Sequence, residues 1–365
     1  MEPNDKETTQ LSLTDRFRRS WFPPAAVVGA LGAFVAAALR VRPAVKASAR
    51  PAESAATPNP AAQAAGSAPP VQGLVRTYAQ SGALGGATSA HPFRRSLAGV
   101  AVGPNDMIYA LGDDEMRVFD STGNPIRTWR VPEKAECFSV GPDQHVYVGA
   151  AGRVEIFEAT GSHVGGFAAG EKNRPAGITA IKVFQKDILV ADAAARIIRR
   201  YDANGKQLGI IGNKSKAGSF ILPNKSLDID IDTKGVIRAT DTGRHQVTSW
   251  AIDGSPLGSF GKFGMSDPAD FVGCCNPVNL ALAPDGTIVT GEKMVARIKV
   301  YQADGKLLAV IGPEHFDPNC IHIYIAVDSK GRILAADPER REVKIFSLVA
   351  KAGTAERKTE EPEST

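Results

Sequence analysis

Apolar residues along this chain recur in short alternating runs, and the same arrangement repeats six times between residues 98 and 346. Each copy has an alternating apolar run, a turn, a second run that often ends in an acidic residue, and a third run that closes on an aromatic residue. Alternation with a period of two residues is typical of strands. The six copies cover Ala98–Asn124, Cys137–Ser162, Thr179–Lys206, Leu227–Ser255, Asn279–Lys306 and Ile323–Phe346.

The spacing of the copies predicts how these strands assemble. Successive closing aromatic residues are separated by 38, 44, 49, 51 and 45 residues, and such steps match the four-stranded blade of a β-propeller. The 36 Gly and 24 Pro residues imply many turns, which favours an all-β protein. We therefore predict a six-bladed β-propeller over residues 73–348. The closing aromatic residues are Phe119, Phe157, Tyr201, Trp250, Tyr301 and Phe346.

The sixth copy lacks a fourth strand of its own. Five copies continue into one, as in residues 206–212 and 306–312, but the sixth stops at Ser347–Leu348. Residues 73–82, GLVRTYAQSG, precede the first copy and have the character of the missing strand. We expect this N-terminal strand to complete the last blade, because joining the two ends protects the sheet edges.

The repeat resembles that of a known family. An apolar-Ala-apolar strand, an Asp-Gly turn, an Ile-x-Val-x-Asp run, a basic residue four positions on and an aromatic residue before Asp-Gly resemble the NHL repeat. The resemblance covers about residues 73–348 and implies an NHL-type six-bladed propeller, while it is weak as a guide to function. The first two copies depart from the motif. The acidic and basic positions are matched by Asp192 with Arg196, Asp241 with His245 and Asp337 with Arg341.

An uncharged apolar segment, residues 21–39, stands near the N-terminus. As a helix it would be about 28 Å long, close to the roughly 30 Å of a hydrocarbon core. Residues 17–22 resemble the twin-arginine export signature, and residues 47–49, Ala-Ser-Ala, fit a cleavage site. We predict that residues 21–42 form a transmembrane anchor, with a cleaved export signal or a buried core helix as the alternatives.

The segments around this helix complete the predicted organisation. We expect residues 1–20 to be cytoplasmic, because both the anchor and the export signal place the propeller outside the cytoplasm. Residues 43–72 are rich in Ala and Pro and poor in large apolar side chains, which predicts a disordered tether. The charged residues 349–365 are predicted to be a disordered tail.

Polar residues in the first strands point to a site in the central channel. Asp228 and Asp230 share one face of a strand, and alignment of the repeats places Lys182 beside Asp230 across adjacent blades. With Asn279, and with Asn224 as a further candidate, the two aspartates offer the oxygen ligands that Ca²⁺ prefers. The related six-bladed lactonases hold such a metal. The alternative, which we favour, is that these groups are paired or hydrogen-bonded in a wet channel.

The four cysteines form a second group of candidates. Alignment places Cys275 and Cys320 at equivalent entries to the fifth and sixth blades, so a disulfide between them suits an exported protein. Cys137 falls within a first strand and is expected to be a small buried apolar residue. Other interpretations are free structural thiols, a soft-metal or haem-side redox site that adds Cys274, His315 and His322, or a rim that binds a partner. The C-x-x-C spacing of zinc and thioredoxin sites is absent.

Charge and motifs narrow the function classes. The net charge of +4 is spread over 365 residues without a basic run, so nucleic acid is not an expected partner. No general base is identifiable, P-loop and nucleophile-elbow motifs are absent, and the histidines that the lyase of this fold uses in its channel are missing. We expect a membrane-tethered or exported module that binds a protein or an envelope component through its rim loops. A metal-dependent hydrolase or lyase, or an accessory to membrane redox chemistry, is the alternative.

Overall fold

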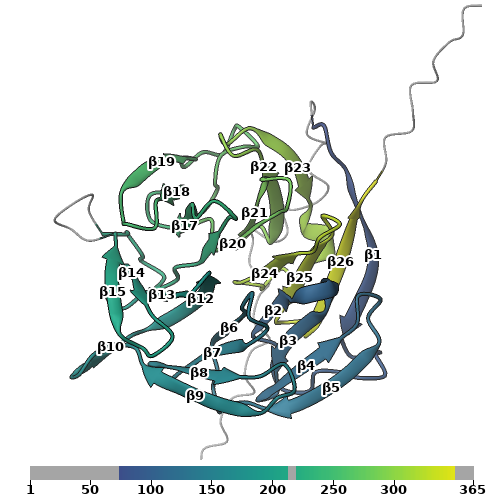
Figure 1. Cartoon of the computed structure of the whole chain (residues 1–365). Coiled ribbons are helices and arrows are strands. Elements are labelled where there is room, and N and C mark those ends of the chain that lie inside the picture. Colours follow the sequence, from purple (N-terminus) through teal and green to yellow (C-terminus); the bar gives the residue numbers. More distant parts are fainter. Residues whose placement is uncertain (1–73, 213–218, 350–365) are drawn as a thin grey trace, which may run out of the picture. The chain divides into compact units, whose positions relative to one another are not determined.

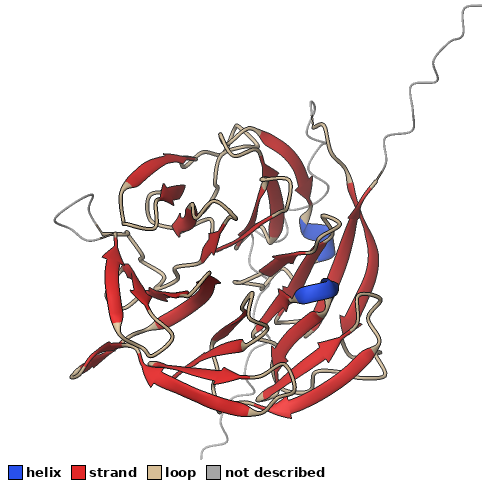
Figure 2. Cartoon of the chain, viewed as in Figure 1, coloured by secondary structure: helices blue, strands red, loops and turns tan. Residues whose placement is uncertain are grey.

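The computed structural model describes residues 74–212 and 219–349. Within them the chain forms six four-stranded antiparallel sheets arranged around a central axis (Figure 1). The predicted all-β, six-bladed propeller is therefore confirmed. Figure 2 shows strands joined by loops, with two short helical turns, η1 (Pro104–Asp106) and η2 (Pro313–His315).

Each of the first three blades runs in sequence order from its inner to its outer strand. Blade 1 contains β2 (Gly99–Val102), β3 (Ile108–Gly112), β4 (Glu115–Phe119) and β5 (Pro125–Arg130). Blade 2 contains β6 (Cys137–Val140), β7 (Val146–Ala150), β8 (Arg153–Phe157) and β9 (His163–Ala168). Blade 3 contains β12 (Ile178–Phe184), β13 (Asp187–Asp192), β14 (Ile197–Tyr201) and β15 (Gln207–Ile211), preceded by the small hairpin β10 (Gly170–Glu171) and β11 (Arg174–Pro175).

The remaining blades follow the same plan, except that the last takes its outer strand from the N-terminal side. Blade 4 contains β16 (Ile229–Ile231), β17 (Ile237–Asp241), β18 (Gln246–Trp250) and β19 (Pro256–Phe260). Blade 5 contains β20 (Asn279–Leu282), β21 (Ile288–Glu292), β22 (Arg297–Tyr301) and β23 (Leu307–Ile311). Blade 6 contains β24 (Tyr324–Val327), β25 (Ile333–Asp337), β26 (Glu342–Leu348) and β1 (Tyr78–Gly85).

The core lies between neighbouring blades, where sheet faces pack against each other. The six closing aromatic side chains are all buried, from 0% exposed at Tyr301 and Phe346 to 6% at Trp250. Each fully buried aromatic ring removes a large apolar area from water, worth roughly 1.5–3 kcal/mol. The aromatic end of the third strand is therefore what joins one blade to the next, as the repeat pattern indicated.

The ring is closed by pairing between the two ends of the described chain. Strand β1 runs antiparallel to β26, with partners from Tyr78–Leu348 to Gly85–Glu342 (Figure 1). The N-terminal closure is thus confirmed, but the strand covers residues 78–85 rather than 73–82. The difference arises because the preceding residues have another role: the N–H groups of Val75 and Arg76 donate to the Leu308 carbonyl on blade 5.

The predicted anchor, tether and most of the predicted tail lie outside the described residues. Among residues 74–212 and 219–349, no helix has the length and apolar character needed to cross a membrane.

Closure by β1 can be tested by truncation. A chain that begins at Gly86 loses the partner of the seven-residue strand β26, and Leu84 leaves the core. Losing several hydrogen bonds and this apolar contact should lower the midpoint of thermal unfolding by roughly 10 °C or more. A chain that begins at Gly73 is the control and should keep the full-length midpoint. An unchanged midpoint in the shorter chain would contradict this closure.

Candidate functional site

One end of the propeller carries the longer connections, and we call it the loop face. Because strands within a blade are antiparallel, the connections from each outer strand to the next inner strand share this end with the turns between second and third strands. Loops on a rigid scaffold are where binding residues concentrate. Binding residues are therefore expected on the loop face and in the channel.

Buried carboxylates hold the connections of the loop face in place. The second strand of a blade ends in, or is followed at once by, Asp113, Asp192, Asp241, Glu292 or Asp337, each at most 7% exposed. The Asp113 carboxylate accepts N–H bonds from Arg94, Arg95 and Ser96 of the incoming connection. Burial alone would raise the pKa of Asp113, but these donors and the Arg117 guanidinium outweigh it and hold the pKa below its usual value.

The same arrangement recurs in other blades. Asp241 accepts from the N–H of Ile221, and Asp337 accepts from the N–H of Asp317 at 2.8 Å. A buried phenylalanine directly precedes each donor, so aromatic packing and the carboxylate act on adjacent residues. In blade 3 the donor is Gly177 and the residue before it is alanine. A carboxylate thus fixes the connection where it enters blades 1, 3, 4 and 6, whereas blade 2 has alanine at this position.

The basic residues at the NHL-like motif positions form no ion pair with these carboxylates among the described residues. Arg196, His245 and Arg341 lie at positive φ in the turns, at 59°, 56° and 52°. The ion pairs to the carboxylates come from neighbours instead: Arg199 pairs with Asp192 at 2.8 Å, Arg244 with Asp241, and Arg340 with Asp337 at 3.9 Å. The motif positions therefore shape the turn, and the charge is balanced nearby.

In the channel, Asp228 and Asp230 bind the exposed edges of inner strands. Asp228 accepts from the N–H of Ile229 on its own strand and from the N–H of Leu280 on the next blade, both at 2.9 Å. In the same way, Asp230 accepts hydrogen bonds from the N–H groups of Ile231 and Leu282. An inner strand has one unpaired edge, and these carboxylates satisfy two such edges at once. The two aspartates thus join blade 4 to blade 5.

The remaining channel residues are placed as follows. Lys182 Nζ lies 3.1 Å from Asp230 Oδ1, so the predicted pairing across adjacent blades is confirmed. Asn279 donates to Asp228 Oδ2 at 3.2 Å, and its own Oδ1 is buried without a hydrogen bond among the described residues. Asn224 Oδ1 accepts from the Thr242 hydroxyl at 2.9 Å, and no hydrogen bond joins Asn224 to either aspartate among the described residues. A calcium ion in this set would contact Asn279 Oδ1, but it would have to displace N–H donors to reach the carboxylates.

Among the four cysteines, only the adjacent Cys274 and Cys275 have sulfur atoms close together, at 2.8 Å. All four are free thiols, so the expected Cys275–Cys320 disulfide is not formed in the structure. Cys275 and Cys320 are both buried, and the Cys320 thiol donates to the His322 carbonyl at 2.9 Å. Cys137 is 8% exposed at the start of β6, as predicted for a small buried apolar residue.

The two predicted histidine ligands face other partners. The His315 ring packs edge-on against Phe346, and the His322 ring stacks on Tyr324. Across the part of the chain that the structure describes, no group of three or more His, Cys, Asp or Glu side chains could hold a metal ion. Burial lowers the pKa of His322, which keeps the imidazole uncharged at neutral pH.

Sequence reasoning missed an apolar patch on the loop face, which we call the rim patch. It comprises side chains from the connections and turns of blades 4 to 6 that are 43% to 81% exposed: Ile221, Phe263, Met265, Met294 and Ile321. Ile221 and Phe263 both flank the turn at 242–245, through Gly243 and through the His245 ring. Among the described connections between strands, exposed large apolar side chains occur only at this end.

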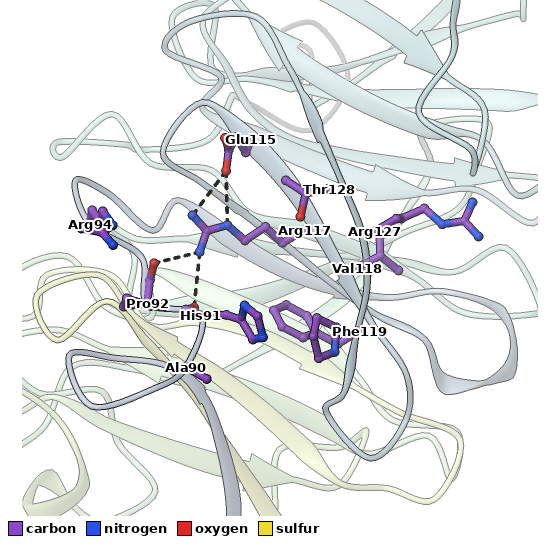
Figure 3. A pocket seen from close by; sticks show the side chains of 11 residues that line it. Ala90, His91, Pro92, Arg94, Glu115, Arg117, Val118, Phe119, Arg127 and Thr128 are labelled. Carbon is purple, nitrogen blue, oxygen red and sulfur yellow. Dashed lines mark hydrogen bonds and ion pairs between the residues drawn. The ribbon is translucent and has the colours of Figure 1, made fainter.

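A pocket of about 300 Å³ lies on blade 1, between the connection at residues 90–94 and strands β4 and β5 (Figure 3). Arg117 at its centre is paired with Asp113 at 3.0 Å and with Glu115 at 3.3 Å. Arg127 donates to the Ala159 carbonyl. The charge of Arg117 is thus balanced by carboxylates, whereas Arg127 bonds to a neutral carbonyl and Arg94 also lines the pocket.

Comparisons with known proteins show the fold alone. No protein family model matches the chain, and no curated protein matches it. A protein of unknown function from Bacteroides thetaiotaomicron has a TM-score of 0.56 at 14% identity, over 75% of this chain and 76% of that chain. A chain of the mitotic checkpoint complex has a TM-score of 0.52 at 10% identity, over 83% and 100%. A streptogramin B lyase has 0.48 at 12% identity, over 75% and 98%.

The raised pKa of Asp228 in the channel predicts how the free energy of unfolding changes with pH. Burial raises the pKa of Asp228 to about 6, above the value of about 3.9 in an unfolded chain. Ionised Asp228 therefore costs stability above pH 6, and this cost is relieved as pH falls from 7.5 to 5. Relative to Asp228→Asn, the wild type should gain about 1 kcal/mol of unfolding free energy over this interval in urea titrations. Parallel pH profiles for the two proteins would contradict the assignment.

Proposed function

We propose that this chain is a binding module whose loop face presents the rim patch to a protein partner. The observation that carries this proposal is the exposure of Met265 at 81%, Ile321 at 61% and Phe263 at 55% on one end of a rigid propeller. Exposed apolar side chains that gather on one surface mark interaction sites more often than isolated ones do. Methionine suits such a surface, because its unbranched thioether adapts to a partner's shape.

The scaffold beneath the patch supports this function. Carboxylate bonds fix the connections near their entry to the blade, so little conformational entropy is lost when a partner docks. The patch spans three blades, which supplies a surface rather than a point contact. Exposed apolar side chains on loops that a rigid scaffold holds in place are well suited to binding a protein.

The proposal also includes the NHL type of the propeller and its location outside the cytoplasm. The matched acidic and basic positions support an NHL-type propeller. The apolar segment at residues 21–42 and the linker that follows support a propeller held outside the cytoplasm by a membrane anchor, or exported after cleavage. The partner is then a protein of that compartment or an envelope component.

The proposal can be tested with two matched serine variants. Phe263 and Leu257 are each 55% exposed, but Phe263 belongs to the rim patch and Leu257 lies on the outer strand β19. In crosslinking experiments with native membranes, the full-length Phe263→Ser, Met265→Ser double variant should recover about tenfold less partner than the wild type, or less still. The reason is that loss of two apolar contacts should weaken binding by at least about 1.4 kcal/mol. Leu257→Ser should bind like the wild type.

Quantitative mass spectrometry of the crosslinked products measures this difference. Equal recovery with the double variant, or an equal loss with Leu257→Ser, would contradict binding through the rim patch. Circular dichroism and thermal unfolding of each variant establish that the propeller is intact before binding is compared.

A further inference from the structure

The connection between β19 and β20 carries two adjacent cysteines in unlike environments. Cys274 is exposed, Cys275 is 4% exposed, and their sulfur atoms are 2.8 Å apart. A disulfide bond is about 2.05 Å long, so the two thiols need to approach by less than about 1 Å to bond. We infer that Cys274 and Cys275 are a redox modification site that closes reversibly into a disulfide between adjacent residues.

The local backbone holds the pair in this position. Gly273 and Cys275 both have positive φ, at 77° and 65°, and a non-glycine residue in that region is retained only when its surroundings enforce it. Asn276 supplies the enforcement. It is fully buried, its amide donates to the Val272 and Lys293 carbonyls, and its Oδ1 accepts from the N–H of Lys293.

The other two cysteines are poor competitors for the reaction. Cys320 is 1% exposed and its thiol is engaged with the His322 carbonyl. Cys137 is buried at the start of β6, and burial raises its pKa well above the usual range for a thiol. Both therefore stay protonated and shielded, whereas Cys274 is open to an oxidant.

The unequal exposure gives the two thiols different roles. With a small external disulfide as oxidant, the Cys274 thiolate attacks one of its sulfur atoms and releases the first thiolate. The Cys275 thiolate then attacks the Cys274 sulfur of the mixed disulfide and releases the second. Two protein thiols lose two electrons and two protons, and the external disulfide is reduced to two thiols. Burial and the neighbouring Cys274 raise the pKa of Cys275, so the first attack on the external disulfide falls to Cys274.

The product should be labile rather than a permanent staple. Adjacent Cα atoms across a trans peptide are about 3.8 Å apart, below the usual range for bridged cysteines, and such geometry makes the bond easier to reduce. This modification site does not depend on the proposed binding function.

Peptide mapping of the full-length protein tests the inference. The protein is treated with oxidised glutathione, its free thiols are alkylated, and it is digested with trypsin. The tryptic peptide 263–293 contains Cys274 and Cys275 but neither Cys137 nor Cys320. We expect this peptide unalkylated and about 2 Da lighter than its dithiol form, and expect dithiothreitol to restore both alkylation sites.

Two variants serve as controls. Cys275→Ser should accumulate glutathione on Cys274, because the resolving thiol is gone, and Cys320→Ser should close the disulfide as the wild type does. The inference is overturned if wild-type peptide 263–293 retains glutathione, remains alkylated at both positions, or is found bridged to a peptide that contains Cys320. The measurement on the wild type does not depend on either variant folding.

Discussion

In four of the six blades, the structure depends on a buried carboxylate at the end of the second strand that binds the incoming connection. A propeller must pass the chain from the outer edge of one blade to the inner edge of the next, and that connection exposes backbone N–H groups near the core. Asp113, Asp241 and Asp337 accept those N–H groups while a phenylalanine beside each donor packs inside. An unpaired buried carboxylate would cost several kcal/mol, so carboxylate and connection are ordered together.

Blade 5 departs from this rule where the loop face is most elaborate. Its acid is Glu292, which pairs with the fully buried Lys299 at 2.6 Å, and Lys299 in turn donates to the Asp270 carbonyl of the incoming connection. The acid reaches the connection through a lysine rather than directly. The connection held in this way carries Phe263, Met265 and the adjacent cysteines. Three residues of the rim patch, Phe263, Met265 and Met294, and the redox pair thus lie in the connection and turn of the blade with the modified anchor.

The repeat pattern was sufficient to predict the blades, the positions of the closing aromatic residues and the N-terminal closure, because the period of two and the fixed spacing reflect the geometry of a blade. The pairing of Lys182 with Asp230 also followed from aligned strands. The role of the carboxylate anchors was missed, although a phenylalanine 20 or 21 residues before the acid is a signal that the sequence carries. The exposure of Met265 and the hydrogen-bond partner of the Cys320 thiol depend on loop conformation. Loops have no hydrophobic periodicity, so the sequence pattern could not predict either feature.

Amide hydrogen exchange tests the central claim, that buried carboxylates fix the connections of the loop face. The N–H groups of Ile221 and Asp317 donate to Asp241 and Asp337 although both residues lie outside strands. The account predicts that they exchange as slowly as N–H groups within the adjacent strands β17 and β25, and faster in the corresponding Asp→Asn variants. Exchange in the wild type at the rate of unprotected loop amides would contradict it.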